Sequence, residues 1–153
     1  MTIYSEILCL DSSENLEIIN LTSKITSVIS ASGISNGLVV VSCRHTTTAL
    51  LVNEFETRLL EDIKIFFNRL IPANDKYLHN DIHLRDCPQD EPENAHSHIM
   101  AMLLNNSEII PVVDGRMTLG QWQSIMMVEL DGPRTRTVQV QIYGERLASQ
   151  SNE

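Results

Sequence analysis

The final third of the chain constrains its fold more than any other feature. Runs rich in Ile, Val and Met follow one another there, separated by short turn signals at Asp114-Gly115 and Asp131-Gly132-Pro133. Val138, Val140 and Ile142 alternate with polar residues, which is the period of two that a strand shows. The pattern predicts strands over Ile109–Val113, Met117–Leu119, Ser124–Leu130 and Thr137–Tyr143.

Four further strands are predicted in the first third of the chain. Ile3–Leu10 and Leu16–Leu21 are rich in Ile and Leu and flank a polar run, so they are predicted to form a hairpin. Gly37–Cys43 is continuous and β-branched, as expected for a strand that is buried on both faces. Thr47–Asn53 is a fourth apolar segment of strand length.

Helices are predicted between and after these strands. The first begins with Thr22 as its N-cap and ends at Gly33, and the second carries apolar residues at helical spacing until Pro72. Residues 73–93 show no periodicity, so they are predicted to form a long loop, and loops of more than ~12 residues in compact domains are usually functional or disordered. A short third helix follows, with Asn94 as its cap.

The resulting order is ββαββα followed by at least three strands. Because strands outnumber helices and do not alternate regularly with them, an α+β fold with a mostly antiparallel sheet is favoured over a doubly wound α/β fold. The chain of 153 residues has the length of one domain. We expect that domain to span residues 1–144 and the polar tail at 145–153 to fray.

Composition and charge argue against two classes of partner. No apolar run approaches the ~20 residues that a membrane helix needs, and the first residues lack the pattern of a secretory signal. We therefore expect a cytoplasmic protein with no membrane partner. A formal net charge of -9 opposes binding to nucleic acid. A small anionic substrate requires basic groups that converge locally, and Arg134 and Arg136 are the one place where two arginines lie close in the sequence.

Histidines are the main candidates for chemistry. Four of the five lie in or just after the irregular segment, and His45 separates two predicted strands. Zinc spacings such as HExxH are absent, and an exposed loop histidine is most often simply solvated. His96 and His98 are two apart, so on a helix they point to different faces and at most one should enter a site.

Two carboxylates and the single tryptophan are further candidates. Glu54 and Glu129 end apolar runs, where a charge is costly unless it is paired or binds a ligand. Each could be a base, a ligand or an ion-pair partner, and the last is the commonest outcome. Trp122 lies between two glutamines next to a glycine; it fits either a core or interface aromatic or a stacking surface for a heteroaromatic ring.

Five segments spread over almost the whole chain resemble the YjbQ-like family, also called the secondary thiamine-phosphate synthase family. They are SCRHTTTALLVNE (Ser42–Glu54), YLHND (Tyr77–Asp81), NAHSHIMAMLL (Asn94–Leu104), IPVVDGRMTLGQWQ (Ile110–Gln123) and DGPRTR (Asp131–Arg136). The resemblance implies an α+β fold whose strands curl into a closed or nearly closed barrel with two helices outside. It also implies a homotrimer with sites near the subunit boundaries.

The family's histidines fall on His45, His79 and His98 in this sequence. We predict that these three converge around one ion, which is either a divalent metal bound by neutral rings or an anion such as phosphate bound by protonated rings. The acidic surroundings favour the metal, and imidazole ligands favour zinc, nickel or copper over magnesium. The resemblance further implies that an aminopyrimidine diphosphate and a thiazole phosphate are joined with release of pyrophosphate, so the ligand would be a small phosphorylated metabolite. Arg134 and Arg136 would clamp the leaving diphosphate. The other predicted substrate contacts are Thr46, Thr47, Asn94, Trp122 and Gln123.

Two other functions fit the same residues. A metal-dependent hydrolase or lyase would use the three histidines as zinc ligands and Glu54 or Glu129 as general base, with His45 also a catalytic candidate. A non-enzymatic trimer would simply hold a metabolite in the same pocket.

Overall fold

The structure is a computed structural model that describes residues 1–146; residues 147–153 lie outside the described part. Most of the tail predicted at 145–153 therefore falls outside it, while Glu145 and Arg146 continue the last strand. In chain order the elements are β1 (Thr2–Asp11), β2 (Glu17–Asn20), α1 (Thr22–Ser32), β3 (Ile34–Cys43), β4 (Thr48–Asn53), α2 (Thr57–Leu70), the 3₁₀ helices η1 (Leu78–Asn80) and η2 (Ile82–Leu84), α3 (Ala95–Leu103), β5 (Ser107–Val113), β6 (Arg116–Met117), β7 (Ser124–Glu129) and β8 (Thr135–Arg146).

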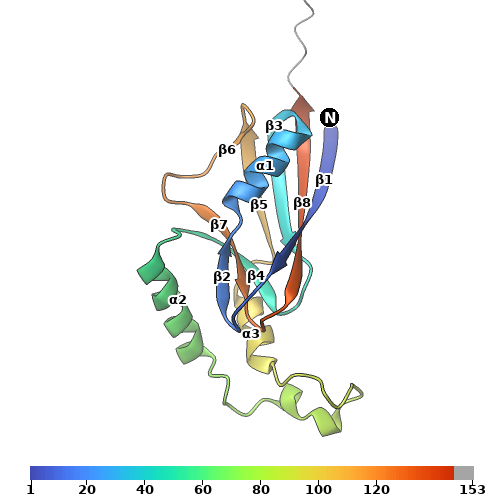
Figure 1. Cartoon of the computed structure of the whole chain (residues 1–153), viewed down its shortest axis with the longest axis vertical. Helices are drawn as coiled ribbons and strands as arrows, with labels where there is room; N and C mark the ends of the chain where they lie inside the picture. The colour runs from blue at the N-terminus through green and yellow to red at the C-terminus, as the bar shows by residue number, and fades with distance from the viewer. Residues whose placement is uncertain (147–153) are drawn as a thin grey trace, which may run out of the picture.

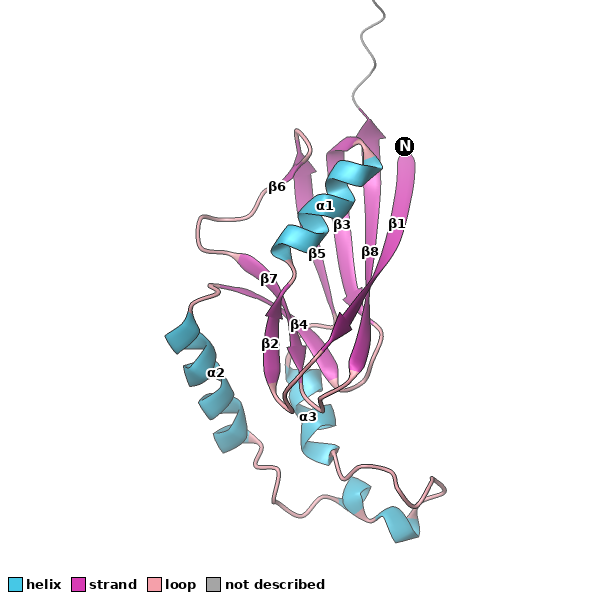
Figure 2. Cartoon of the chain, viewed as in Figure 1, coloured by secondary structure: helices cyan, strands magenta, loops and turns pink. Residues whose placement is uncertain are grey.

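The strands form two antiparallel sheets. One has the order β1-β8-β3-β5-β6 and the other the order β2-β7-β4. Helix α1 crosses one face of the larger sheet, α3 packs against the smaller sheet at β4, and α2 stands beside the smaller sheet (Figures 1 and 2). The predicted α+β class with a curled, mostly antiparallel sheet is confirmed. The described strands are split between two sheets and do not close into one barrel. The three helices predicted from the sequence pattern are all present, whereas the resemblance implied two outside the barrel.

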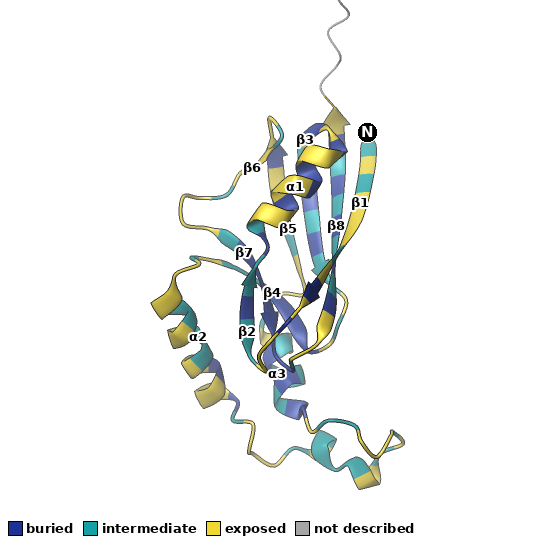
Figure 3. Cartoon of the chain, viewed as in Figure 1, coloured by how far each residue is buried: buried dark blue, intermediate teal, exposed yellow. Residues whose placement is uncertain are grey.

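Strand β7 joins two hydrophobic clusters. Its Ile125 and Met127 pack into the cluster under α1, and Met126 and Val128 pack into the cluster under α2 and α3. This is the strand that is buried on both faces (Figure 3). Strand β3, for which this was predicted, alternates instead: Val39 and Val41 are buried and Leu38 is exposed.

The predicted hairpin between the first two strands is wrong. Strand β1 pairs with β8, and β2 pairs with β7 in the other sheet. The polar run between them therefore crosses from one sheet to the other, and its Ser12 bonds to the β7–β8 connection.

Thr22 is the first residue of α1, after Leu21 at the cap position, while Gly33 ends the helix with a φ of 66° as predicted. None of the helices in residues 1–146 combines the length and apolar character that a membrane span requires.

Candidate functional site

The candidate site lies along α3, where the β3–β4 connection and η1 each form a depression against this helix. His79 and His98 have ring centroids 4.9 Å apart in an edge-on arrangement. His45 and His98 line one open depression of about 530 Å³. His79 and His98 line an adjoining depression of about 390 Å³. His98 thus lines both depressions, and the three histidines, which come from separate segments, lie at one end of the molecule.

Helix α3 and the loop before it hold the His79–His98 pair. Asn80 accepts a hydrogen bond from the backbone N–H of Ala95 at 3.0 Å, and Arg85 donates to the carbonyl of His79 at 2.8 Å. Burial lowers the pKa of His98 below its ordinary value, and the nearby His79 lowers it further. The neutral ring is therefore favoured at His98, which is the form that can give a lone pair to a metal.

His45 is held by the first residues of β8. Its Nε2 accepts a hydrogen bond from the backbone N–H of Thr137 at 2.9 Å and lies 3.1 Å from the hydroxyl of the same residue. Burial lowers the pKa of His45, and the positive charge of Arg136 lowers it further. The hydrogen bonds among residues 1–146 leave Nδ1 of this ring without a partner.

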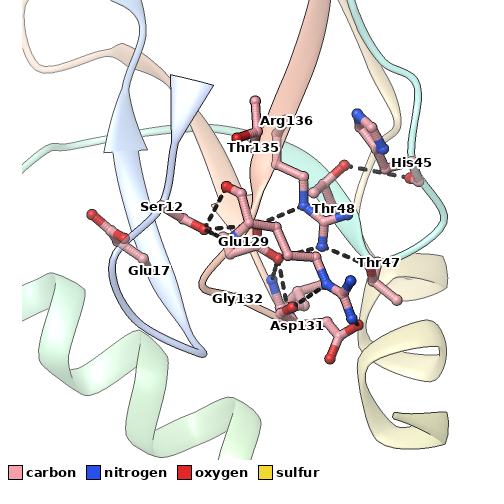
Figure 4. Close-up of polar contacts among 12 residues, drawn as sticks. Ser12, Glu17, His45, Thr47, Thr48, Glu129, Asp131, Gly132, Thr135 and Arg136 are labelled. Carbon is pink, nitrogen blue, oxygen red and sulfur yellow. Dashed lines mark hydrogen bonds and ion pairs between the residues drawn. The ribbon is translucent and has the colours of Figure 1, made fainter. Parts of the chain in front are cut away.

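Behind the histidines, Glu129 and Arg136 form a buried ion pair (Figure 4). The guanidinium donates from Nε and from Nη2 to the two carboxylate oxygens at 2.6 Å each, and Nη2 also donates to the hydroxyl of Thr47 at 2.9 Å. Glu129 is 0% exposed and Arg136 is 6% exposed. Arg136 therefore cannot reach a substrate phosphate in this conformation, contrary to the clamp expected from the sequence.

Glu129 has no free position for a proton-transfer role. Besides Arg136, its oxygens accept from the backbone N–H groups of Leu130 and Asp131 and from the hydroxyl of Ser12, at 3.0, 2.8 and 3.1 Å. Burial raises the pKa of Glu129, but the hydrogen bonds from Arg136, Asp131 and Ser12 outweigh it, and the pKa lies below its ordinary value. The geometry therefore favours the ion-pair role that sequence reasoning left open over the role of general base.

A second polar group surrounds Asp131. Its carboxylate accepts from the side-chain amide of Asn94 at 2.7 Å and from Arg134 at 2.9 Å. Asn94 occupies the cap position of α3, yet its side chain makes no cap hydrogen bond, and its buried Oδ1 has no partner in residues 1–146. The Arg134 side chain is 42% exposed, so of the two predicted phosphate-binding arginines it alone reaches solvent.

Three predicted site residues lie at the other end of β4. In the pairing of β4 with β7, Thr48 lies opposite Glu129, and Asn53 lies opposite Ser124. Five strand steps of ~3.3 Å from Thr48 to Asn53 place these two pairs roughly 17 Å apart. Glu54, Trp122 and Gln123 adjoin the distant pair, Trp122 is 66% exposed, and Gln123 bonds to the backbone of Gly120 at 2.8 Å. Within one chain they do not meet the histidines.

Sequence reasoning missed Arg44, a basic residue of the site. Arg44 is exposed and lines the depression of His45 and His98, and its guanidinium makes no ion pair or hydrogen bond with the described residues. Its position in the Arg44-His45-Thr46 break between two strands was the available signal. Thr46 is exposed on the same depression, whereas Thr47 is buried against Arg136. His98 borders the depression, and His96 does not.

No set of three or more His, Cys, Asp or Glu side chains within residues 1–146 has the spacing of a metal site. His79 and His98 are close enough to act together, whereas the Nε2 of His45 is already used by Thr137. Two of the three predicted ligands thus lie close together, and the third has its Nε2 bound to Thr137.

Comparisons with known proteins agree over most of the chain. The family model described as UPF0047 protein YjbQ-like matches residues 6–145. A UPF0047 protein of Methanothermobacter thermautotrophicus is 41% identical over 145 residues, covering 95% of each chain, and one of Archaeoglobus fulgidus is 40% identical over 86% of this chain and 94% of that one. A hypothetical protein of Aeropyrum pernix has a similar structure, with a TM-score of 0.84 and 38% identity over 93% of this chain and 99% of that one. A protein of unknown function from Sulfolobus solfataricus also reaches a TM-score of 0.84, with 32% identity over 94% and 99% of the two chains.

Proposed function

Because the chain belongs to the UPF0047 YjbQ-like family, we propose that it is a cytoplasmic enzyme acting on small phosphorylated metabolites at the depression beside His45 and His98. The reaction we propose joins an aminopyrimidine diphosphate to a thiazole phosphate. One observation carries the proposal. Arg44 has no carboxylate partner among the described residues and lines this depression together with two histidines. A volume of about 530 Å³ is within the usual range for small-molecule sites.

The reaction needs groups that bind the leaving diphosphate more than it needs a strong base. The thiazole nitrogen forms a bond to the methylene carbon of the pyrimidine while the bond from that carbon to the diphosphate oxygen breaks, and pyrophosphate leaves with the bonding electrons. Arg44 can bind phosphate oxygens as a planar cation, and the hydroxyl of Thr46 can donate to them. The partly exposed side chain of Arg134 adds a further positive charge, and the buried Arg136 holds Thr47 in place by a hydrogen bond.

A metal-dependent hydrolase or lyase is the second candidate, supported by the contact between the rings of His79 and His98. These two residues would hold a divalent metal such as zinc, which would supply a Lewis acid for a phosphoryl or carbonyl oxygen. The remaining ligands would have to come from substrate, water or another subunit. His45 would join them only if its hydrogen bond to Thr137 broke.

Assembly into a homotrimer is part of the proposal. The face of the larger sheet opposite α1 carries an apolar row across its strands, because Ile3 pairs with Tyr143, Tyr143 with Leu38, and Leu38 with Pro111. Ile3 and Leu38 are exposed in one chain. The β6–β7 connection that carries Trp122 lies well above α3 of the same chain (Figure 1). In the proposed trimer, Trp122 approaches the site of a neighbouring subunit instead.

The proposal is tested by incubating the purified protein with the two phosphorylated substrates and following thiamine phosphate by chromatography, with and without a chelator. We expect product in wild-type protein and a loss of at least tenfold in Arg44→Ala and His98→Ala. His83→Ala, on the exposed η2, is the matched control. Product that disappears with chelator and returns with zinc favours a metal at His79 and His98. Binding of both substrates without turnover would replace the enzyme with a metabolite-binding protein.

A further inference from the structure

Two consecutive residues of β8 hold the two ends of the turn His45-Thr46-Thr47. At one end the guanidinium of Arg136 donates to the hydroxyl of Thr47 at 2.9 Å. At the other end the backbone N–H of Thr137 donates to Nε2 of His45 at 2.9 Å. Thr46, between the two fixed residues, is exposed. The turn is thus fastened from the strand beneath it and presents its middle residue to the depression.

The contact at His45 continues the pairing of the sheet. The ladder between β3 and β8 ends at Cys43 and Val138. Immediately before Val138, the backbone N–H of Thr137 has no β3 carbonyl to bond to. It donates instead to the imidazole of His45. This amide cannot turn away, because Thr137 is also paired with Cys9 of β1. A backbone N–H fixed in this way must find an acceptor, and the lone pair on Nε2 is that acceptor.

This hydrogen bond determines the tautomer of the ring. A neutral imidazole has one nitrogen with a lone pair and one nitrogen with a proton. Since Nε2 accepts from Thr137, the proton of neutral His45 is on Nδ1. A protonated Nδ1 can donate a hydrogen bond but cannot bind a metal.

The ion pair behind the turn keeps this arrangement in place. Arg136 is bound by both oxygens of Glu129, and Glu129 is fully buried and fixed by backbone N–H groups on the β7–β8 connection. Thr48 adds a weaker contact by donating its hydroxyl to the carbonyl of His45 at 3.4 Å (Figure 4). Every support of the turn therefore originates in the core, and none depends on a ligand.

We propose that Arg136 and Thr137 position His45 as a neutral hydrogen-bond donor, through Nδ1–H, to an anionic oxygen of the substrate, and that His45 is not a metal ligand. The inference rests on the proposed function only in placing the substrate at the depression that His45 and Arg44 line. A neutral donor beside a guanidinium suits a phosphate oxygen, because it adds a hydrogen bond without requiring a second buried charge.

Nuclear magnetic resonance of the full chain with ¹⁵N-labelled histidine tests the assignment without any turnover. In wild-type protein near neutral pH we expect Nδ1 of His45 to be protonated, Nε2 to be unprotonated, and a scalar coupling between Nε2 and the amide nitrogen of Thr137. Addition of pyrophosphate should shift the Nδ1–H signal. Addition of zinc should shift His79 and His98 and leave His45 in the same tautomer. A proton on Nε2, or zinc bound to His45, overturns the proposal.

Variants separate positioning from general structure. Thr47→Val keeps the shape of the side chain and removes the acceptor for Arg136, so we expect a weaker coupling from Thr137 to His45 and a mixture of tautomers, with kcat lowered more than KM is raised. Thr26→Val, which removes an exposed hydroxyl on α1, should leave the His45 signals unchanged. Unaltered His45 signals in Thr47→Val would refute the positioning role.

The proposed function and this inference can fail separately. If the expected tautomer is found and pyrophosphate shifts Nδ1–H while no thiamine phosphate forms, the reaction is wrong and the role of His45 stands. If product forms and the Nδ1–H signal does not respond to pyrophosphate, the donor role is refuted.

Discussion

The side-chain oxygen of Asn80 accepts the backbone N–H of Ala95 at 3.0 Å, so the segment that carries His79 closes over the first turn of the helix that carries His98. A helix of nine residues has few internal bonds, and its first N–H groups need partners from elsewhere. One hydrogen bond therefore both caps α3 and ties the segment that carries His79 to the helix that carries His98.

Replacing Asn80 should weaken this end of the molecule. We expect Asn80→Ala to lower the free energy of unfolding by about 1 kcal/mol, as for loss of a helix cap, and to speed hydrogen exchange at Ala95. Asn80→Asp should keep the cap, because the carboxylate accepts the same bond and is favoured at a helix N-terminus. Chemical denaturation checks both values. Asn15→Ala, at an exposed connection, is the control, and equal losses in Asn15→Ala and Asn80→Ala would contradict the capping role.

The cap shows how far the sequence could predict this region. Asn94 was predicted as the cap from its place before a short apolar helix, and the helix does begin at Ala95. Its side chain bonds instead to Asp131, which lies in the turn after β7, and the cap comes from the preceding loop. Local sequence predicts where a helix begins. It does not reveal which distant group competes for the capping side chain.

The buried pair of Glu129 and Arg136 leads to a second prediction. Glu129→Gln leaves the guanidinium of Arg136 buried without its counter-charge, and removing one partner of such a pair costs about 3–5 kcal/mol. We expect a loss of that size by denaturant unfolding. The double variant Glu129→Leu with Arg136→Met should lose less than the single variant, because no charge is left buried. A double variant as unstable as Glu129→Gln would contradict this account.

The same carboxylate predicts how stability depends on pH. Burial raises the pKa of Glu129, the hydrogen bonds from Arg136, Asp131 and Ser12 outweigh that effect, and the folded pKa lies below 4.5. Between the folded pKa and about pH 4.5, Glu129 of the unfolded chain binds more protons than Glu129 of the folded chain. The stability that this carboxylate contributes is therefore present above about pH 4.5 and is lost as the pH falls through the folded pKa. Thermal unfolding between pH 3 and pH 7 should show a shallower acid loss in the double variant than in wild type.

Strand pairing explains which site residues could be found from the sequence. The three histidines were recognised from the family's phrases, and their segments do meet at one end of the sheet. Glu54 and Trp122 belong to phrases just as distinctive, yet the register of β4 against β7 places them at the opposite end of the strand from Thr48. A single sequence gives strands and turns, but the register that decides which strand ends lie together is a tertiary property. The false hairpin between β1 and β2 has the same cause.

The outer face of the larger sheet leads to the last prediction, on assembly. Ile109 is 59% exposed there and lies opposite Val40, whereas Ile65 is 53% exposed on α2, away from that face. If the face is buried between subunits, a lysine at Ile109 places a charge in an apolar interface and should dissociate the trimer, while Ile65→Lys should not. Light scattering should then give about three times 17.3 kDa for wild type and Ile65→Lys, and 17.3 kDa for Ile109→Lys.

The fluorescence of Trp122, the only tryptophan, is an independent measurement of dissociation. If Trp122 lies at a subunit boundary, its emission should shift to longer wavelength when the trimer dissociates. A wild-type mass of 17.3 kDa at all concentrations would refute the trimer and leave the apolar row to be covered by something else.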